Sequence, residues 1–398
     1  MAAALEGVRV LDASNVLAGP FCGMILGDFG ADVVKLEHPT EGDPIRHHAP
    51  IVDGAPLMWK MLGRNKRSVG CDFGDEAHRA AFRQACEEAD VVILTFRPSR
   101  LRAWGIAPAD LLARNPRLVV ATVSGFGLEG PLADAAGFGT LAEAMSGYAY
   151  RNGFPDSPPV LPPFGLADSV AGMNLALGVV LALHERERSG EGQHVAVSLV
   201  DSLVTLLQPQ NAHYAAAGVV AGRIGNRSSA NAPRELYRCA DGEYVAVSCS
   251  TNSTAYRLME FVDGGEEVAA QEWFGQPHGR AAHADEIDEV LRPWFAKRTA
   301  PEALALLLDA EIPAAPVHNA ATMATDEQLR ANQVLVEVPD PGGAGPTVTM
   351  PNVHIRLSRT PGTIRWPGRD LAADGASIDE WTAAGTWSAA PGPEGEGS

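Results

Sequence analysis

The amino-acid sequence predicts an α/β protein in which a large domain with a doubly wound parallel sheet is joined to a smaller α+β domain. Short apolar segments alternate with helical patterns through the first half of the chain, as in parallel sheets with helices on both faces. A hairpin pattern followed by helical segments begins near residue 233. The 398 residues are enough for two domains.

Each element of the large domain is expected from its local pattern. Apolar segments predict strands at 8–12, 33–37, 67–72, 91–94, 118–124 and 193–199. Amphipathic or capped segments predict helices at 21–29, 75–89 and 108–114, and one beginning at Asp201. Ligands of doubly wound sheets bind beyond the carboxyl ends of the strands, so a site is expected in the loops that follow them.

The stretch 162–188 is the most distinctive in the chain. A Pro- and Gly-rich loop leads to Asp168, and an apolar run follows from Val170 to Leu183. This predicts a buried helix that is capped by Asp168 or Ser169 and ends at Gly190. The apolar run is too short to predict a membrane span. From its position alone, Asp168 is either an ordinary helix cap or an ionised nucleophile stabilised by the helix dipole.

Composition changes divide the chain into expected parts. Residues 1–210 form the Rossmann-like N-terminal part of the large domain, and the Gly-, Arg-, Asn- and Ser-rich segment 211–232 is a linker. The small α+β domain covers 233–325 and includes a hairpin with its turn near Asp241 and Gly242. The chain then returns to the large domain over 326–384, and a Pro- and Gly-rich tail at 385–398 is expected to be disordered.

The overall charge limits the possible partners. A formal net charge of −18 argues against general binding to nucleic acids or anionic membranes. Five cysteines are scattered without a Cys-x-x-Cys pair, which indicates reduced thiols and a cytoplasmic protein. The histidines have no metal-like spacing, so no metal site is expected. The N-terminus lacks the pattern of a signal peptide.

Common nucleotide-binding motifs are missing or misplaced. The pattern Gly-x-Gly-x-x-Gly occurs at Gly125, Gly127 and Gly130, but it follows the fifth expected strand and leads into no clear helix. A ribose-binding acid at the required distance is also absent, so we interpret the pattern as a chance match. The phosphate loop of NTPases does not occur.

Basic residues gather at 64–67 and 96–102, next to the third and fourth expected strands. In so acidic a chain, these clusters either bind a phosphate-bearing ligand or are ordinary solvated side chains.

An ordered series of short motifs resembles the class III (CaiB/BaiF-type) CoA-transferase family. The motifs cover nearly the whole chain: Leu5–Asp12, Leu17–Pro20, Asp28–Glu37, Asn65–Ser68, Ala89–Val92, Phe96–Pro98, Asn115–Arg117, Ser124–Gly127, Ala167–Ser169, Gly190–His194 and Arg223–Arg227.

This resemblance implies a function and an assembly. It implies an enzyme of acyl-CoA metabolism that moves CoA from an acyl-CoA to a small carboxylic acid, through aspartyl anhydride and aspartyl-CoA thioester intermediates. Asp168 falls on the catalytic aspartate of the family and would be the nucleophile. CoA would be a substrate, with no permanently bound cofactor. The resemblance also implies an interlocked homodimer.

The resemblance also implies a set of CoA-binding residues. These are Val16, Leu17, Ala18, His38, Cys71, Asp72, Phe73, Thr95, Phe96, Arg97 and Arg102.

Several positions depart from the family pattern. Basic residues or Asn are common in the family where this chain has His38, Gly74, Thr95, Ala103 and Ala136, and an acid is common where it has Gly139. We expect Arg97, Arg100 or Arg102, together with Lys66 or Arg67, to replace the missing charges toward the CoA phosphates.

Two other functions are compatible with these motifs. An acyl-CoA racemase or isomerase of the same superfamily would need a proton-exchanging Gly-His-Asp motif, and the chain has Gly137, Phe138 and Gly139 there. A non-catalytic acyl-CoA binding protein would account for the missing charges, but it gives no reason for a carboxylate in a dry pocket.

Overall fold

The computed structural model describes residues 3–207, 209–340, 347–385 and 387. The chain forms two compact units. The first, here called the sheet unit, comprises Met1–Tyr148, Leu161–Pro209 and Gln328–Ser398, and the second, the small unit, comprises Ala149–Val160 and Gln210–Glu327. The tail expected at 385–398 lies outside the described residues except for Gly385 and Trp387.

Six described strands form a parallel sheet, which confirms the predicted doubly wound domain. In spatial order they are β5 (Lys66–Gly70), β2 (Asp32–Glu37), β1 (Arg9–Ala13), β6 (Val91–Leu94), β7 (Val119–Ser124) and β8 (His194–Ser198). The register places Leu11 opposite Val34 on one side and Val92 on the other. The strand order reverses between β1 and β6, where doubly wound folds bind their ligands.

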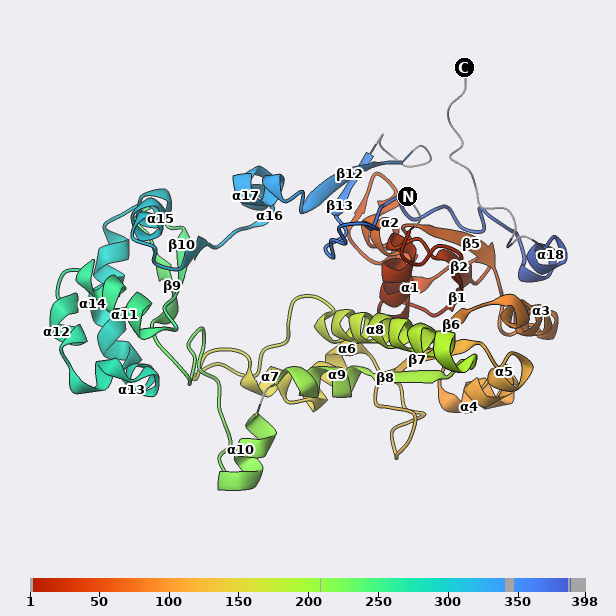
Figure 1. The fold of residues 1–398 in the computed structure, drawn as a ribbon, viewed down its shortest axis with the longest axis horizontal. Helices are drawn as coiled ribbons and strands as arrows, with labels where there is room; N and C mark the ends of the chain where they lie inside the picture. Colours follow the sequence, from red (N-terminus) through yellow and green to blue (C-terminus); the bar gives the residue numbers. More distant parts are fainter. Residues whose placement is uncertain (1–2, 208, 341–346, 386, 388–398) are drawn as a thin grey trace, which may run out of the picture. The chain divides into compact units, whose positions relative to one another are not determined.

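Helices cover both faces of this sheet because successive strand residues point to opposite faces. Val10 of β1 belongs to a core with α1 (Ala18–Asp28), α8 (Leu166–Ser189) and α9 (Leu199–Leu206). Its neighbour Leu11 belongs to a core with α3 (Glu76–Glu88), α4 (Pro98–Ala103), α5 (Pro108–Arg114) and α18 (Ile378–Ala383). Figure 1 shows α1 and α8 on one side of the strands and α3 to α5 on the other.

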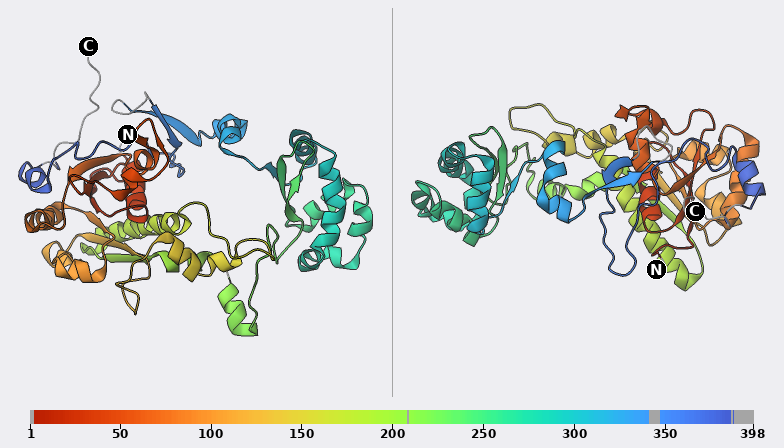
Figure 2. Two further views of the ribbon diagram at one scale, coloured as in Figure 1. Left: turned by 180° about the vertical axis from the view of Figure 1, so that it is seen from behind. Right: turned by 90° about the horizontal axis from the view of Figure 1, so that it is seen from above.

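The segment 363–375 packs against the first elements of the chain, as the views in Figure 2 show for the blue and red segments. The Asn65 side chain donates hydrogen bonds to Asp28 and to the Thr363 carbonyl, both at 2.9 Å. Gly375 forms a parallel bridge with Val69 of β5. The remaining elements of this unit are η1 (Pro44–His47), β3 (Ile51–Val52), β4 (Ala55–Pro56), α2 (Leu57–Leu62), α6 (Gly139–Met145), β12 (Leu335–Pro339) and β13 (Thr347–Pro351).

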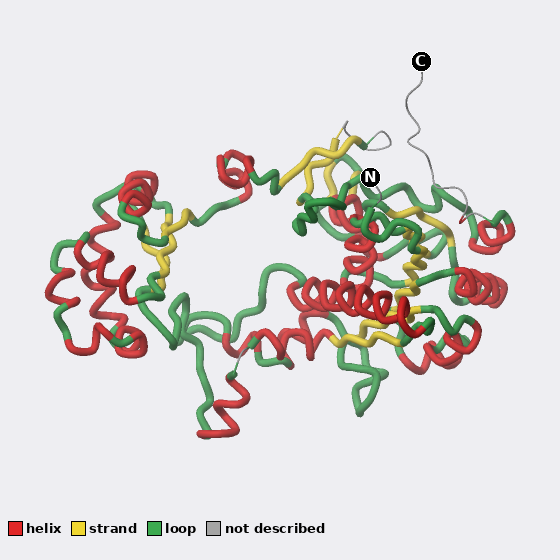
Figure 3. The backbone as a smooth tube through the Cα atoms, in the orientation of Figure 1, coloured by secondary structure: helices red, strands yellow, loops and turns green. Residues whose placement is uncertain are grey.

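The small unit contains the expected α+β structure. Its antiparallel sheet has the order β11 (Ala314–Pro316), β10 (Tyr244–Ser248) and β9 (Arg234–Arg238), and Figure 3 shows these strands in yellow beside red helices. The predicted hairpin is confirmed, and Gly242 in its turn has a φ of 86°. The helices are α10 (Gln210–Ala217), α11 (Asn252–Glu260), α12 (Gly265–Ala269), η2 (Glu272–Gly275), α13 (Pro277–Ala282), α14 (Ala284–Ala296), α15 (Ala300–Asp309) and α16 (Ala320–Thr325). Two short helices cross the unit boundaries, α7 (Tyr148–Arg151) and α17 (Glu327–Ala331).

Helix α8 differs from its prediction in three respects. It begins at Leu166 with Gly165 as N-cap and no capping side chain, so the expectation that Asp168 or Ser169 caps it is wrong. It is also not buried all round, because Leu177 and Leu181 are about 60% exposed. Its end at Gly190, with a φ of 79°, is confirmed.

The third difference concerns its length. With 24 residues and a hydropathy of 1.8, α8 is long and apolar enough to cross a membrane by length and composition, because it extends beyond the apolar run at both ends. A core helix passes the same test, and half of the apolar window of α8 is buried in contacts that include α1 and α9.

Candidate active site

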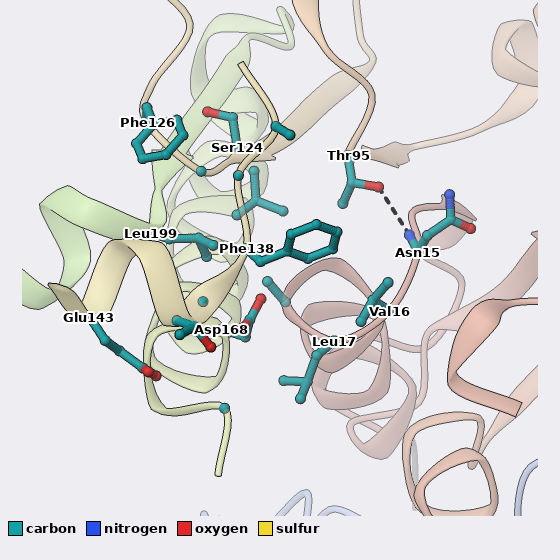
Figure 4. A pocket seen from close by; sticks show the side chains of 18 of the residues that line it. Asn15, Val16, Leu17, Thr95, Ser124, Phe126, Phe138, Glu143, Asp168 and Leu199 are labelled. Atoms are coloured by element: carbon teal, nitrogen blue, oxygen red, sulfur yellow. Dashed lines mark hydrogen bonds between the residues drawn. The ribbon is translucent and has the colours of Figure 1, made fainter. Parts of the chain in front are cut away.

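A pocket of about 630 Å³ opens at the carboxyl ends of β1, β6 and β7 in the sheet unit. The loops that follow these strands supply Val16, Thr95 and Phe126, and the start of α8 supplies Asp168. Figure 4 shows these side chains around the same cavity, with Phe138 crossing it. The site therefore lies where the strand order of the sheet predicts a ligand.

Asp168 is the third residue of α8 and lies in the first turn of the helix. Burial and, to a smaller extent, the negative charge of Glu143 raise the pKa of its carboxyl to about 6, while a backbone hydrogen bond acts in the opposite direction. Desolvation therefore outweighs the opposing effect of the helix terminus on this pKa. A pKa near 6 still leaves most of the carboxylate ionised at neutral pH.

Glu143 is a second carboxylate of this pocket, and sequence reasoning missed it. It lies on α6, is 3% exposed, and accepts a hydrogen bond of 3.3 Å from the backbone N–H of Ala167. It therefore binds the first turn of α8, directly before Asp168. No local signal reveals this role, because an acid between two alanines on a short helix is usually solvated.

The loop 137–139 closes tightly on Asp168. A β-carbon at Gly139 would lie 2.1 Å from Oδ2 of Asp168, and one at Gly137 would lie 2.8 Å from the α-carbon of Gly125. Only glycine at position 139 is compatible with the present orientation of the Asp168 carboxylate. The absence of an acid at Gly139 thus leaves Asp168 in contact with backbone instead of a second side chain.

The start of α1 presents backbone groups to the pocket. Helix α1 begins at Ala18 without a side-chain cap, so its first N–H groups lack intrahelical acceptors and carry partial positive charge. The preceding loop is fixed by a 3.0 Å hydrogen bond from the Asn15 N–H to Oγ1 of Thr95, drawn as a dashed line in Figure 4. The N-termini of α1 and α8 therefore lie at one cavity, an arrangement that favours negative charge there.

The structure brings together about half of the predicted CoA-binding residues. The pocket with Asp168 is lined by Val16, Leu17, Ala18, Thr95, Phe96 and Arg97. His38, Cys71, Asp72, Phe73 and Arg102 are not among its lining residues.

These five residues have other surroundings in the structure. Cys71 and Phe73 are buried in the core beneath α3, where the Phe73 ring packs on Phe96 at 5.0 Å. Nε2 of His38 lies 4.0 Å from Oδ2 of Asp72 at a half-exposed position. The exposed Arg102 lies 3.7 Å from Asp134.

The expected contribution of Lys66 and Arg67 to phosphate binding is wrong. Nζ of Lys66 is 1% exposed and lies 2.7 Å from Oδ2 of Asp12. Arg67 is also buried, with its guanidinium 2.5 Å from Asp32. Both side chains belong to the edge strand β5 and already neutralise carboxylates of β1 and β2, so neither is available to a ligand.

Sequence reasoning missed further parts of the lining because they depend on how distant loops meet. These are Asn15, His48, Ser124, Gly125, Phe126, Phe138, the segment 162–165 and Leu199. The position of Gly125 and Phe126 directly after β7 is the one signal that identifies some of them.

Among the described residues, no group of three or more His, Cys, Asp or Glu side chains is arranged to hold a metal ion.

Comparisons with known proteins agree on one family over most of the chain. The profile of CoA-transferase family III matches residues 5–374. Succinyl-CoA–D-citramalate CoA-transferase of Chloroflexus aurantiacus is 36% identical over 94% of this chain and 92% of its own. The beta subunit of succinyl-CoA–L-malate CoA-transferase from the same organism is 37% identical, over 92% and 91%.

A solved structure supports the same relationship. The crystal structure of a CAIB/BAIF family protein from Brucella suis superposes with a TM-score of 0.82 at 30% identity, covering 96% of this chain and all of its own.

Proposed function

We propose that this chain, which belongs to CoA-transferase family III, transfers CoA from an acyl-CoA thioester to an acceptor carboxylate with Asp168 as the nucleophile. The observation that carries this assignment is the position of Asp168. It is a partly buried carboxylate that lies in the first turn of α8 and lines the pocket at the switch point of the sheet. A nucleophile must be ionised and shielded from water, and both conditions are met near neutral pH.

The reaction proceeds through successive acyl transfers between CoA, Asp168 and the two carboxylic acids. Asp168 attacks the thioester carbonyl, which forms a mixed anhydride and releases CoA thiolate. The thiolate attacks the aspartyl carbonyl of the anhydride, which releases the donor acid and forms an aspartyl-CoA thioester. An acceptor carboxylate then attacks this thioester, and the returning thiolate takes the acceptor acyl group, so that Asp168 is regenerated.

The surrounding backbone supports this chemistry. Each attack places negative charge on a carbonyl oxygen, and donors fixed in advance stabilise such charge without reorganisation. The uncapped N-terminus of α1 at Ala18 supplies donors on the pocket wall. Every step exchanges one activated acyl bond for another, so the cycle needs no ATP.

The relatives support a substrate class. They are named for succinyl-CoA together with D-citramalate or L-malate, which are hydroxylated dicarboxylic acids. We therefore propose a short dicarboxylic acyl-CoA as donor and a small hydroxylated dicarboxylate as acceptor. No nucleic acid or membrane takes part in this reaction.

A direct assay tests the proposal. The protein is incubated with succinyl-CoA and either L-malate or D-citramalate, and the CoA thioesters are separated by liquid chromatography and mass spectrometry. We expect one succinate for each new thioester, and no transfer by Asp168→Asn. Transfer by that variant at the wild-type rate would overturn the role of Asp168, and exchange of the α-proton without transfer would indicate a racemase.

We further propose that the protein is a cytoplasmic homodimer. All five cysteines are unpaired and buried, as in proteins of reducing compartments. Helices α6 and α8 expose large apolar side chains, among them Met145, Leu177 and Leu181, which a second copy would cover. A monomeric mass in solution at micromolar concentration would overturn the dimer.

A further inference from the structure

Val16 has a backbone conformation that is unusual for its residue type. Its φ is 69°, in the left-handed region, which a β-branched side chain occupies only when its surroundings enforce it. Val16 connects β1 to α1 and lines the pocket that contains Asp168. An outlier of this kind at a binding pocket indicates that other groups hold it in place.

The group that holds Val16 is a buried carboxylate. The Val16 N–H donates a 3.0 Å hydrogen bond to Oδ1 of Asp43, and the Ile45 N–H donates to the same oxygen at 3.0 Å. Oδ2 of Asp43 forms an ion pair with Nζ of Lys35 at 3.0 Å, and both side chains are fully buried. Asp43 therefore links the ammonium group of Lys35 to the strained backbone at Val16.

Lys35 contacts the same loop directly. Its Nζ donates to the carbonyl of Ser14, two residues before Val16, and to the Leu36 carbonyl at 3.2 Å. Burial lowers the pKa of Lys35, but the carboxylates of Asp43, Asp12 and Glu37 outweigh this effect and raise it. Lys35 is therefore charged at neutral pH and binds the loop through the carbonyl of Ser14.

We propose that Asp43 and Lys35 are positioning residues, which keep Val16 in the left-handed conformation and thereby fix the start of α1 at the pocket. The inference rests on the proposed CoA transfer, for which this loop forms part of the acyl-CoA site. Neither residue lines the pocket, so both act through the backbone of Ser14 and Val16.

A double-mutant cycle separates this role from general stability. Asp43→Asn weakens the acceptor for the Val16 N–H and removes the counter-charge of Lys35. Val16→Gly removes the strain, because glycine adopts positive φ readily. For Asp43→Asn we expect the KM for succinyl-CoA to rise about tenfold, with kcat at saturation changed less than about twofold. In the Val16→Gly background, the same substitution changes KM by less than about twofold.

A matched control breaks another buried ion pair. Nζ of Lys60 lies 2.8 Å from Asp340, and both side chains are at most 7% exposed. Asp340→Asn should lower the melting temperature, as Asp43→Asn does, but leave KM unchanged. The affinity for free CoA, measured by calorimetry, gives a readout independent of turnover.

Each outcome of these experiments either supports or overturns the positioning role of Asp43 and Lys35. Equal effects of Asp43→Asn in the two backgrounds, or an unchanged KM, overturn the inference. If Asp43→Asn alone does not fold, a folded Asp43→Asn/Val16→Gly protein with the KM of Val16→Gly supports it, and an unfolded one overturns it. Failure of the proposed function is distinct, because the wild-type protein would then transfer no CoA.

Discussion

A methyl group on Gly139 would lie 2.1 Å from Oδ2 of Asp168. The two residues come from α6 and α8 and meet because Glu143 of α6 binds the first turn of α8. Gly139→Ala should therefore displace the carboxylate and lower kcat/KM by about 100-fold, the usual cost of moving a catalytic group by about 1 Å. Steady-state kinetics with succinyl-CoA measure this.

The control for Gly139→Ala is Ala144→Ser, which adds one atom at an exposed position of the same helix. Its kcat/KM should equal that of the wild type. An active Gly139→Ala variant would mean that the orientation of Asp168 in this structure is not the reactive one.

The carboxyl of Asp168 is expected to set the acidic limb of the pH profile, and Glu143 contributes to its position. Burial and the charge of Glu143 raise the pKa of Asp168 to about 6, and only the ionised form attacks. The kcat/KM should therefore fall as pH decreases through about 6. Glu143→Gln removes the repulsion but keeps an oxygen for the Ala167 N–H, so the limb should move to lower pH.

The exposed Glu129 provides the control for this shift, because it lies on the loop after β7 outside the pocket lining. Glu129→Gln should leave the limb in place. A limb that stays near pH 6 in Glu143→Gln would show that the charge of Glu143 does not raise the pKa of Asp168.

Asp168 is also expected to reduce the stability of the fold. Its pKa is about 6 in the folded protein against 3.8 for an ordinary aspartate, so the folded state retains a proton that the unfolded chain releases between these values. The free energy of unfolding therefore decreases as pH rises through this window. Asp168→Asn should raise it at pH 7 by up to about 3 kcal/mol.

Urea unfolding at pH 4 and pH 7 measures this difference. The stabilising effect of Asp168→Asn should be much smaller at pH 4 than at pH 7. An equal effect at the two pH values would show that ionisation is not its cause.

Arg97 is expected to bind a phosphate group of CoA. It is exposed and lines the pocket, whereas Lys66 and Arg67 are occupied by Asp12 and Asp32. Arg97→Ala should raise the KM for acyl-CoA by about tenfold or more with little change in kcat.

Two further variants sharpen this prediction. The triple variant Arg97/Arg100/Arg102→Ala should lose more affinity for CoA, and Arg114→Ala, at a surface pair with Glu87, should lose none. An unchanged affinity of the triple variant would exclude this arginine cluster as the phosphate site.

The sheet could be predicted from the sequence because its strands are short, strongly apolar and separated by helical patterns. The position of Asp168 before a long apolar run left open whether it is a helix cap or a nucleophile, and only the family resemblance implied the second role. The predicted N-cap of α8, Asp168 or Ser169, lies three or four residues after the observed N-cap Gly165, which provides no side-chain signal for a cap.

The immediate environment of Asp168 could not be predicted in the same way. Glu143 and Gly139 reach it through the packing of α6 on α8, which no local pattern encodes. Lys66 and Arg67 looked like ligand-binding groups, but the register of β5 beside β2 buries them near carboxylates.

The central claim is that Asp168 carries the acyl group and then CoA during turnover. The most direct test is to incubate the protein with succinyl-CoA and hydroxylamine and to sequence its peptides by tandem mass spectrometry. We predict a hydroxamate at Asp168, formed only when acyl-CoA is present and absent from Asp168→Asn. An active wild-type protein with an unmodified Asp168, or with the label at another carboxylate such as Glu143, would contradict the account.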